Sequence, residues 1–204
     1  MKDIILQKKT HGFFDELVSY FASICALGTS LELQNRGIAQ PWLPNQHLTL
    51  EGMKSVTNCT IRFYPHAMLN TISNNRWPEE IKLQEIPLKS NPVNHPINLT
   101  SIQMIHGSMI QSAFIHYFES YRVQVESKFG KETIKWPEIW NFARVIRNAF
   151  AHGGKIKFDN QKSLKVNWKS LEYDPKSNGK NILYTDITPV EVIYLMEEMD
   201  RARR

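Results

Sequence analysis

The 204-residue sequence has only two cysteines and no apolar run that approaches the length of a membrane span. Cys25 and Cys59 lack the close spacing of zinc ligands, so we expect reduced thiols inside the fold rather than a metal site or a disulfide framework. A transmembrane helix needs roughly 20 consecutive apolar residues. The sequence therefore predicts no metal and no membrane association.

Other class-specific signals are also missing. The sequence contains no internal repeat, no low-complexity segment and no glycine-rich phosphate loop. The apolar stretch within residues 1–14 is short and interrupted by charge, unlike a secretory signal peptide. These absences favour a soluble cytoplasmic protein and predict no cofactor.

Apolar residues make up 42% of the chain, which is enough for one domain with a sizeable core, so residues 1–204 are expected to form a single domain. The net charge of +5 allows a polyanionic partner without requiring one. Between residues 155 and 180, seven lysines, Lys155 and Lys157 among them, stand against three acidic residues. Such a segment could neutralise RNA phosphates, although charge alone favours a solvated surface.

Apolar spacing of three and four residues predicts a first amphipathic helix over about 13–34. Residues 36–98 hold seven of the ten prolines and show no sustained period, so they are expected to form an irregular insertion. Within it, short strands are expected near residues 48–52 and 59–64, and a short helix near 66–73.

The clean helical pattern returns in residues 99–204. A long helix is predicted from Asn98 or Thr100 to about Phe129, where Gly130 ends it. A second helix is predicted over residues 137–152, with Pro137 suited to its first turn. The two helices are expected to form a hairpin in the core.

Beyond that hairpin, alternating residues predict a strand over 164–173 and a return strand over 181–187, joined by a turn at Asn178-Gly179. Thr188 and Glu191 match a capping box at the start of a last helix. The expected fold is thus mainly α, a helical bundle with a small β-hairpin and an irregular proline-rich insertion.

The stretch RNAFAHGG, residues 147–154, places polar residues where a packing helix does not need them. At 100° per residue, Arg147, Asn148 and His152 share one face with the small Ala151. The opposite face is apolar and is expected to lie in the core; it comprises Ile139, Phe142, Ala143, Val145, Ile146, Ala149 and Phe150. Arg147 and His152 lie about 140° apart, so they present a shallow polar surface rather than an intrahelical pair.

Simpler explanations exist for each polar group. His152 could cap the last turn of the helix before two glycines, with Arg147 in solvent. Arg144 lies on the same face and suits either a phosphate or a dimer salt bridge. Glu119 is level with Arg147 in an antiparallel hairpin, yet the helical wheel assigns it to solvent. The tryptophans Trp136, Trp140 and Trp168 are better explained by packing than by base stacking.

The segment RVIRNAFAHGG, residues 144–154, resembles the HEPN family and its Arg-x4-6-His motif. The long preceding helix, the hairpin after the motif and the capped final helix are similar to plasmid- and defence-associated branches of that family. The resemblance covers roughly residues 99–204, with the first helix completing the bundle. It leaves residues 36–98 unexplained.

The resemblance implies a HEPN-like bundle that dimerises through the motif face, and a metal-independent endoribonuclease acting as a toxin or phage-defence effector. Arg147 and His152 would be the catalytic pair and Asn148 would orient the site. RNA would be the substrate, contacted also by Arg144, Lys155 and Lys157, and an antitoxin or regulatory protein would be a further partner. Two alternatives remain open: a non-catalytic HEPN-like module that binds RNA, a nucleotide or a protein, and a plain helical interaction domain.

Overall fold

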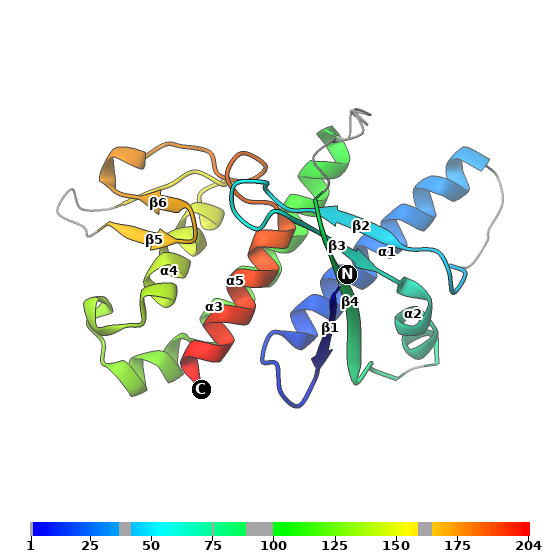
Figure 1. Ribbon diagram of the computed structural model, residues 1–204, viewed down its shortest axis with the longest axis horizontal. Coiled ribbons are helices and arrows are strands. Elements are labelled where there is room, and N and C mark those ends of the chain that lie inside the picture. Colours follow the sequence, from blue (N-terminus) through cyan, green and yellow to red (C-terminus); the bar gives the residue numbers. More distant parts are fainter. Residues whose placement is uncertain (1, 37–41, 75, 89–99, 159–164) are drawn as a thin grey trace.

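The computed structural model describes residues 2–36, 42–74, 76–88, 100–158 and 165–204 (Figure 1). Within these ranges the long helices gather around one central helix, and a four-stranded sheet packs beside them. The helices are α1 (Phe14–Arg36), α2 (Pro65–Ser73), α3 (Thr100–Phe129), α4 (Glu138–Ala151) and α5 (Pro189–Arg203). The strands are β1 (Lys2–Gln7), β2 (Leu48–Glu51), β3 (Cys59–Phe63), β4 (Glu80–Pro87), β5 (Val166–Trp168) and β6 (Leu171–Tyr173).

Helix α3 is the centre of the helical part, because it contacts α1, α4 and α5. Its aromatic stripe is fully or almost fully buried at Phe114, Tyr117 and Phe118. The three long helices predicted from periodicity over residues 13–34, 98–129 and 137–152 are confirmed as α1, α3 and α4. The start of α3 at Asn98 lies outside the described residues. No helix in the described part of the chain is long and apolar enough to cross a membrane.

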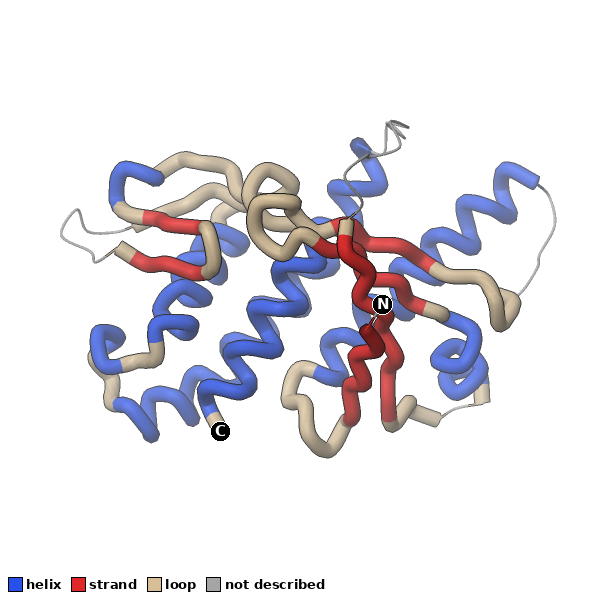
Figure 2. The backbone as a smooth tube through the Cα atoms, in the orientation of Figure 1, coloured by secondary structure: helices blue, strands red, loops and turns tan. Residues whose placement is uncertain are grey.

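The larger sheet is antiparallel throughout, with the strand order β1-β4-β3-β2. One face buries Ile61, Phe63, Ile81 and Leu83. It packs on α1, where the ring of Phe21 stacks on that of Phe63 with centroids 4.2 Å apart. Figure 2 shows this sheet and the β5–β6 pair on opposite sides of α3 and α5.

The expectation of an irregular insertion over residues 36–98 is therefore wrong for its described part. The short strands and the short helix expected within it are present as β2, β3 and α2. What the sequence did not reveal is the pairing of β4 with β1, in which Ile4 lies opposite Leu83. The fold is accordingly mixed α/β rather than mainly α. Prolines lie at the ends of the strands in this region. Because the prolines are so frequent, the alternation of apolar and polar residues within each strand is hard to recognise in the sequence.

The small hairpin near the C-terminus differs from the prediction in register and position. Strands β5 and β6 pair across a tight turn at Lys169-Ser170, where Lys169 has a left-handed φ of 51°. Residues 181–187 form only isolated bridges, so the predicted return strand is wrong. Glu198 on α5 stabilises this turn. Its carboxylate accepts a 2.7 Å hydrogen bond from the Trp168 indole and pairs with Lys169 at 3.4 Å.

The start of α5 is tied to the sheet. The predicted capping box is confirmed, since Thr188 accepts from the backbone N–H of Val190 and Glu191 accepts from that of Thr188. The fully buried Glu191 also accepts from the backbone N–H of Met53 at 2.7 Å and from the Thr57 hydroxyl. A cap readable from the sequence thus also joins α5 to the β2–β3 loop.

The candidate motif face on helix α4

Helix α4 carries the motif, and its apolar stripe is buried as predicted from Phe142 to Phe150, with Ile139 packed at the edge of the core. The helical wheel places Trp140 on the same side of α4 as Arg144 and Arg147, but the structure makes this polar face narrower. Trp140 is fully buried, and its indole donates a 3.0 Å hydrogen bond to the carbonyl of Met199. Because α3 and α5 both pack on α4, its first turns are enclosed on two sides. All three candidate base-stacking tryptophans are core residues: Trp136, Trp140 and Trp168.

Arg147 lies half-buried between α4 and α3. Its Nη2 atom is 2.6 Å from the Oε1 atom of Glu119, and its Nη1 atom donates a 3.4 Å hydrogen bond to the Oδ1 atom of Asn148. The Nε atom is buried and has no hydrogen-bond partner among the described residues. The guanidinium is therefore oriented by two neighbours and retains an unused donor.

Glu119, which the helical wheel assigns to solvent, is partly exposed but is also paired with the neighbouring helix. Its side chain is 37% exposed, and besides Arg147 it pairs with Arg122 at 3.6 Å on the same helix. A helical wheel gives the direction of a side chain around its own axis, but the crossing of α3 and α4 decides whether that direction meets a neighbour. Glu119 is thus the one residue of the site that sequence reasoning considered and dismissed.

His152 occupies the C-cap position of α4. The backbone N–H of His152, rather than its imidazole, bonds to the carbonyls of Asn148 and Ala149. Gly153 and Gly154 follow with φ of 70° and 83°, a left-handed conformation that ends the helix. The imidazole is exposed and makes no hydrogen bond or ion pair within the ranges that the structure describes. Side-chain capping therefore does not explain this histidine.

The two motif side chains are not brought together within one chain. Four residues lie between Arg147 and His152, and the five steps along the helix correspond to a rise of about 7.5 Å along the axis. Arg147 contacts Asn148 and Glu119, whereas His152 faces solvent at the end of the helix. A site that uses both groups on one phosphate would need a ligand that spans them or a second chain that completes them.

The predicted RNA-contacting residues lie around the same helix end. Arg144 is half-buried one turn before Asn148. Lys155 and Lys157 are exposed and flank the buried Ile156, whose N–H bonds to the carbonyl of Lys180 at 2.9 Å. These two lysines are therefore on the surface directly after the motif.

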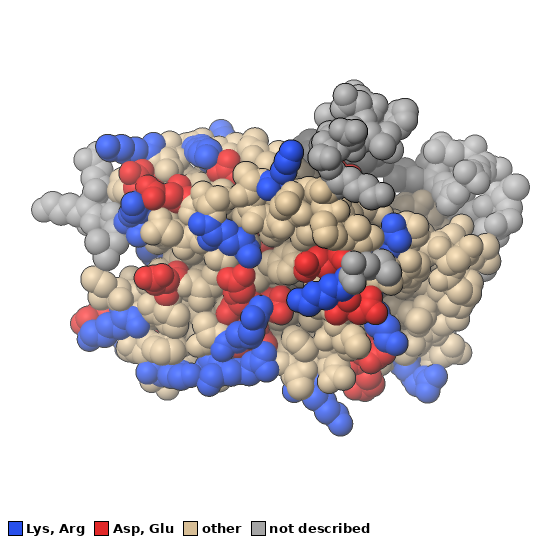
Figure 3. Space-filling model, in the orientation of Figure 1, with Lys and Arg blue, Asp and Glu red and all other residues tan. Residues whose placement is uncertain are grey.

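Part of the lysine excess is neutralised by the fold itself. Ion pairs join Lys165 to Glu172 at 2.9 Å and Lys180 to Asp186 at 2.7 Å. On the face shown in Figure 3, basic side chains are interspersed with acidic ones around α5 and the sheet. The part of the lysine-rich segment at residues 159–164 lies outside the described residues.

In the described ranges, no group of three or more His, Cys, Asp or Glu side chains is placed to hold a metal ion. No protein-family model matches the chain, and neither a curated protein nor a solved structure matches it significantly.

Proposed function

We propose that this protein is a metal-independent endoribonuclease of HEPN type that acts as a homodimer through the motif face of α4. The observation that carries the proposal is the exposed His152, without an intramolecular partner in the described structure, on the same helix as the oriented Arg147. Packing accounts for the apolar stripe of α4 but not for the exposed His152, and Arg147 keeps one donor unused beside its pair with Glu119. The resemblance of residues 144–154 to the HEPN motif supplies the reaction class.

The chemistry follows from the two side chains. His152 accepts the proton of an RNA 2'-hydroxyl, whose oxygen attacks the adjacent phosphorus. The bond from phosphorus to the 5'-oxygen then breaks, and that oxygen takes a proton from a second imidazole. Arg147 stabilises the additional negative charge of the transition state. The products are a 2',3'-cyclic phosphate and a 5'-hydroxyl.

The dimer supplies what one chain lacks. A step that removes one proton and delivers another is served best by two imidazoles, and one motif face carries a single one at His152. Two motif faces related by a twofold axis would place both histidines and both Arg147 side chains around one cleft. The small, exposed Ala151 between them allows close approach of the partner helix.

The biological role proposed with this activity is that of a toxin or phage-defence effector in the cytoplasm. A ribonuclease that is active in the cytoplasm would harm its own cell, so an antitoxin or regulatory protein is proposed as a further partner. Only the family resemblance supports this part of the proposal.

Cleavage of single-stranded RNA by the purified protein in the presence of EDTA tests the proposed reaction. We expect cleavage that EDTA does not reduce, with 2',3'-cyclic phosphate ends, and a molar mass in solution of two chains. Loss of cleavage on chelation, or products with a 3'-hydroxyl, would contradict the mechanism. Binding of RNA without cleavage under any condition would favour the non-catalytic module.

Replacement of Glu119 by glutamine is expected to strengthen RNA binding about two- to fivefold at low salt. Glu119 competes with a phosphate for Arg147, and the substitution removes its charge while keeping its shape. Stability is expected to change by less than about 1 kcal/mol, since the pair is partly exposed. Fluorescence anisotropy with a labelled RNA measures the affinity.

The matched control for this measurement is Glu126→Gln. Glu126 pairs with Arg122 on the same helix, but has no ion pair with Arg147 among the described residues. The control variant is expected to bind RNA like the parent protein. An equal gain in RNA affinity in both variants would mean that the lower negative charge of the protein causes the effect, and not the loss of competition at Arg147.

A further inference from the structure

The loop at residues 180–187 is joined to the end of the motif helix by its backbone. The N–H of Ile182 donates a 3.0 Å hydrogen bond to the carbonyl of Gly154. The neighbouring Asn181 pairs with Lys155 in an isolated antiparallel bridge. The backbone of Asn181 is therefore held beside the residues that directly follow α4.

The rest of the loop keeps Asn181 in this place. Tyr184 has a left-handed φ of 60°, which is rare for a bulky residue and persists only where the surrounding structure enforces it. Its N–H donates to the carbonyl of Ile187 at 2.7 Å, and the hydroxyl of Thr185 donates to the carbonyl of Asn181 at 2.6 Å. The position of Asn181 is thus fixed from both directions along the chain.

Two side-chain amides meet over the end of the motif helix. A Cβ atom at Gly154 would lie 3.1 Å from Oδ1 of Asn181 and 3.8 Å from Nε2 of Gln111, so the two amides are close neighbours. Neither amide makes a hydrogen bond with any residue that the structure describes, and Asn181 is exposed. These two side chains, termed the amide pair, therefore offer donors and acceptors to a ligand.

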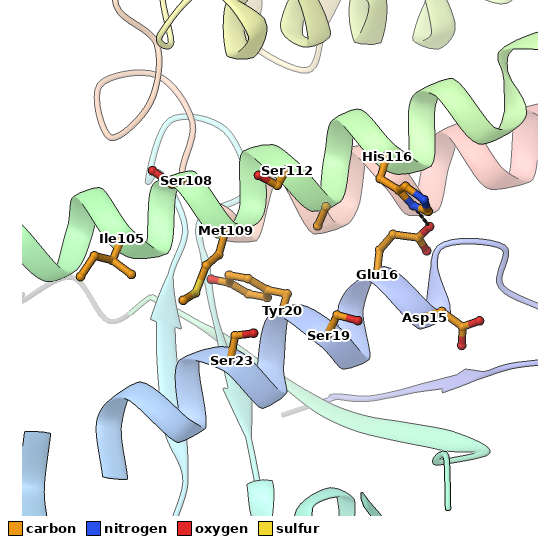
Figure 4. A pocket seen from close by; sticks show the side chains of 11 residues that line it. Asp15, Glu16, Ser19, Tyr20, Ser23, Ile105, Ser108, Met109, Ser112 and His116 are labelled. Carbon is orange, nitrogen blue, oxygen red and sulfur yellow. Dashed lines mark hydrogen bonds and ion pairs between the residues drawn. The ribbon is translucent and has the colours of Figure 1, made fainter. Parts of the chain in front are cut away.

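The amide of Gln111 belongs to the motif face and not to the large groove of the molecule. That groove, of about 810 Å³, runs between α1 and α3, and Ser108, Ser112 and His116 of α3 line it (Figure 4). Gln111 does not line this groove but reaches the end of α4 at Gly154. The amide pair therefore lies on the same side of α3 as the motif helix.

The amide pair and the motif arginine mark the two ends of one stretch of α3 and α4. Glu119, which holds Arg147, is eight residues from Gln111 on α3, about 12 Å along the axis. Helix α4 runs in the opposite direction, from Arg147 beside Glu119 to Gly154 beside Gln111. The exposed His152 lies between these ends. An RNA strand bound along this stretch passes from Arg147 over His152 to the amide pair.

The chemistry of a carboxamide decides which base it binds through two hydrogen bonds. Its donor and its acceptor lie side by side. On the Hoogsteen edge, adenine presents the N7 acceptor next to the N6 amino donor, whereas guanine presents two acceptors. The pyrimidines present a single polar group at this edge. An amide that binds this edge with both groups therefore selects adenine.

We propose that Asn181 binds an adenine next to the scissile phosphate and thereby sets the base preference of the proposed ribonuclease. Its Nδ2 atom donates to N7 of the base, and its Oδ1 atom accepts from the N6 amino group. Gln111 adds one hydrogen bond to the same nucleotide from α3. The inference rests on the proposed ribonuclease for its substrate, but the contact itself is measurable without cleavage.

Binding of 2'-O-methyl RNA tests the contact alone, because the methyl group blocks the attacking oxygen. In fluorescence anisotropy with the full chain, an adenosine oligomer is expected to bind at least about tenfold more tightly than a uridine or cytidine oligomer. An oligomer of 7-deazaadenosine keeps the stacking surface but lacks the N7 acceptor. It is expected to bind about tenfold more weakly than the adenosine oligomer.

Replacement of Asn181 by leucine is expected to abolish the difference between the adenosine and 7-deazaadenosine oligomers. The side chain is exposed and has no hydrogen bond in the described structure, so the Tm is expected to stay unchanged. Gln111→Leu is expected to lower the adenosine preference about threefold, the effect of one neutral hydrogen bond. Asn45→Leu, which replaces an exposed amide in the loop before β2, is the control and is expected to keep the full preference.

Two results would overturn the base contact. One is equal affinity of the parent protein for the adenosine and 7-deazaadenosine oligomers. The other is a preference for adenosine that persists in Asn181→Leu.

The base contact and the ribonuclease fail in distinguishable ways. Cleavage of RNA by a protein that binds all the oligomers equally would overturn the base contact and leave the ribonuclease standing. Binding that selects adenosine through N7, without cleavage of any RNA, would support the contact and contradict the ribonuclease. Absence of any RNA binding would overturn both.

Discussion

Replacement of His152 by alanine is expected to lower the rate of RNA cleavage by about 100-fold or more, since general acid–base catalysis contributes typically 10²–10⁴-fold. Arg147→Ala is expected to lower it by a similar factor, because removal of one transition-state donor costs about 10²–10³. Initial rates on single-stranded RNA, measured at saturating substrate, check both values. Neither loss is expected to come from unfolding: the His152 side chain is exposed and the Arg147 side chain is only half-buried.

Two substitutions elsewhere serve as controls. His47→Ala removes an imidazole that contacts the ring of Tyr64, away from α4. Arg201→Ala removes an exposed arginine that pairs with Glu197 on α5. Both are expected to cleave RNA at the parent rate. Cleavage that is unchanged by loss of either His152 or Arg147 would contradict the assignment of the site.

Replacement of Asp200 by alanine is expected to have the largest effect on stability, a loss of about 3–5 kcal/mol in the free energy of unfolding. Asp200 is fully buried, and its Oδ1 atom lies 2.5 Å from Nη2 of Arg203. The same oxygen accepts from the backbone N–H of Gly12 at 3.2 Å and from the Tyr117 hydroxyl at 3.3 Å. The substitution leaves a largely buried arginine without its partner. Urea unfolding measures the loss.

The packing around this carboxylate explains why the effect is expected to be large. The guanidinium of Arg203 lies 3.8 Å from the centroid of the Tyr121 ring. A Cβ atom at Gly12 would come within 2.2 Å of Arg203 Nη2 and 2.8 Å of Asp200 Oδ1, so a larger residue there would displace the groups of this ion pair. One carboxylate thus joins the end of α5 to α3 and to the β1–α1 loop.

Glu197→Ala is the comparison for Asp200→Ala. Glu197 lies one turn earlier on α5 and forms a solvent-accessible pair with Arg201. Such pairs contribute about 0–1 kcal/mol, so little change is expected. If both variants lost the same stability, the buried network would not be the source of the effect.

Local signals in the sequence were sufficient to predict the long helices. The apolar spacing of three and four residues predicted α1, α3 and α4, and the residues Thr188 and Glu191 predicted the start of α5. These features depend on contacts within a few residues of one another, which a single sequence displays directly. The same is true of the buried stripe of α4 from Phe142 to Phe150.

The sheet could not be predicted in the same way. Strands β1 and β4 are separated by more than 70 residues, and neither forms a stable structure without its partner. The prediction of the short hairpin was wrong for a related reason. Its turn at Lys169 is stabilised by Glu198 on α5, while the more typical turn sequence Asn178-Gly179 lies elsewhere.

The sequence by itself determined the helices, their buried faces and the presence of Arg147, Asn148 and His152 on one helix, because each follows from helical periodicity. Only the tertiary structure decided that Glu119 holds Arg147 and that His152 stays free within the described chain. These relations depend on how α3 and α4 cross. Crossing angles and register arise from side-chain packing across the whole core, which no local pattern in the sequence specifies.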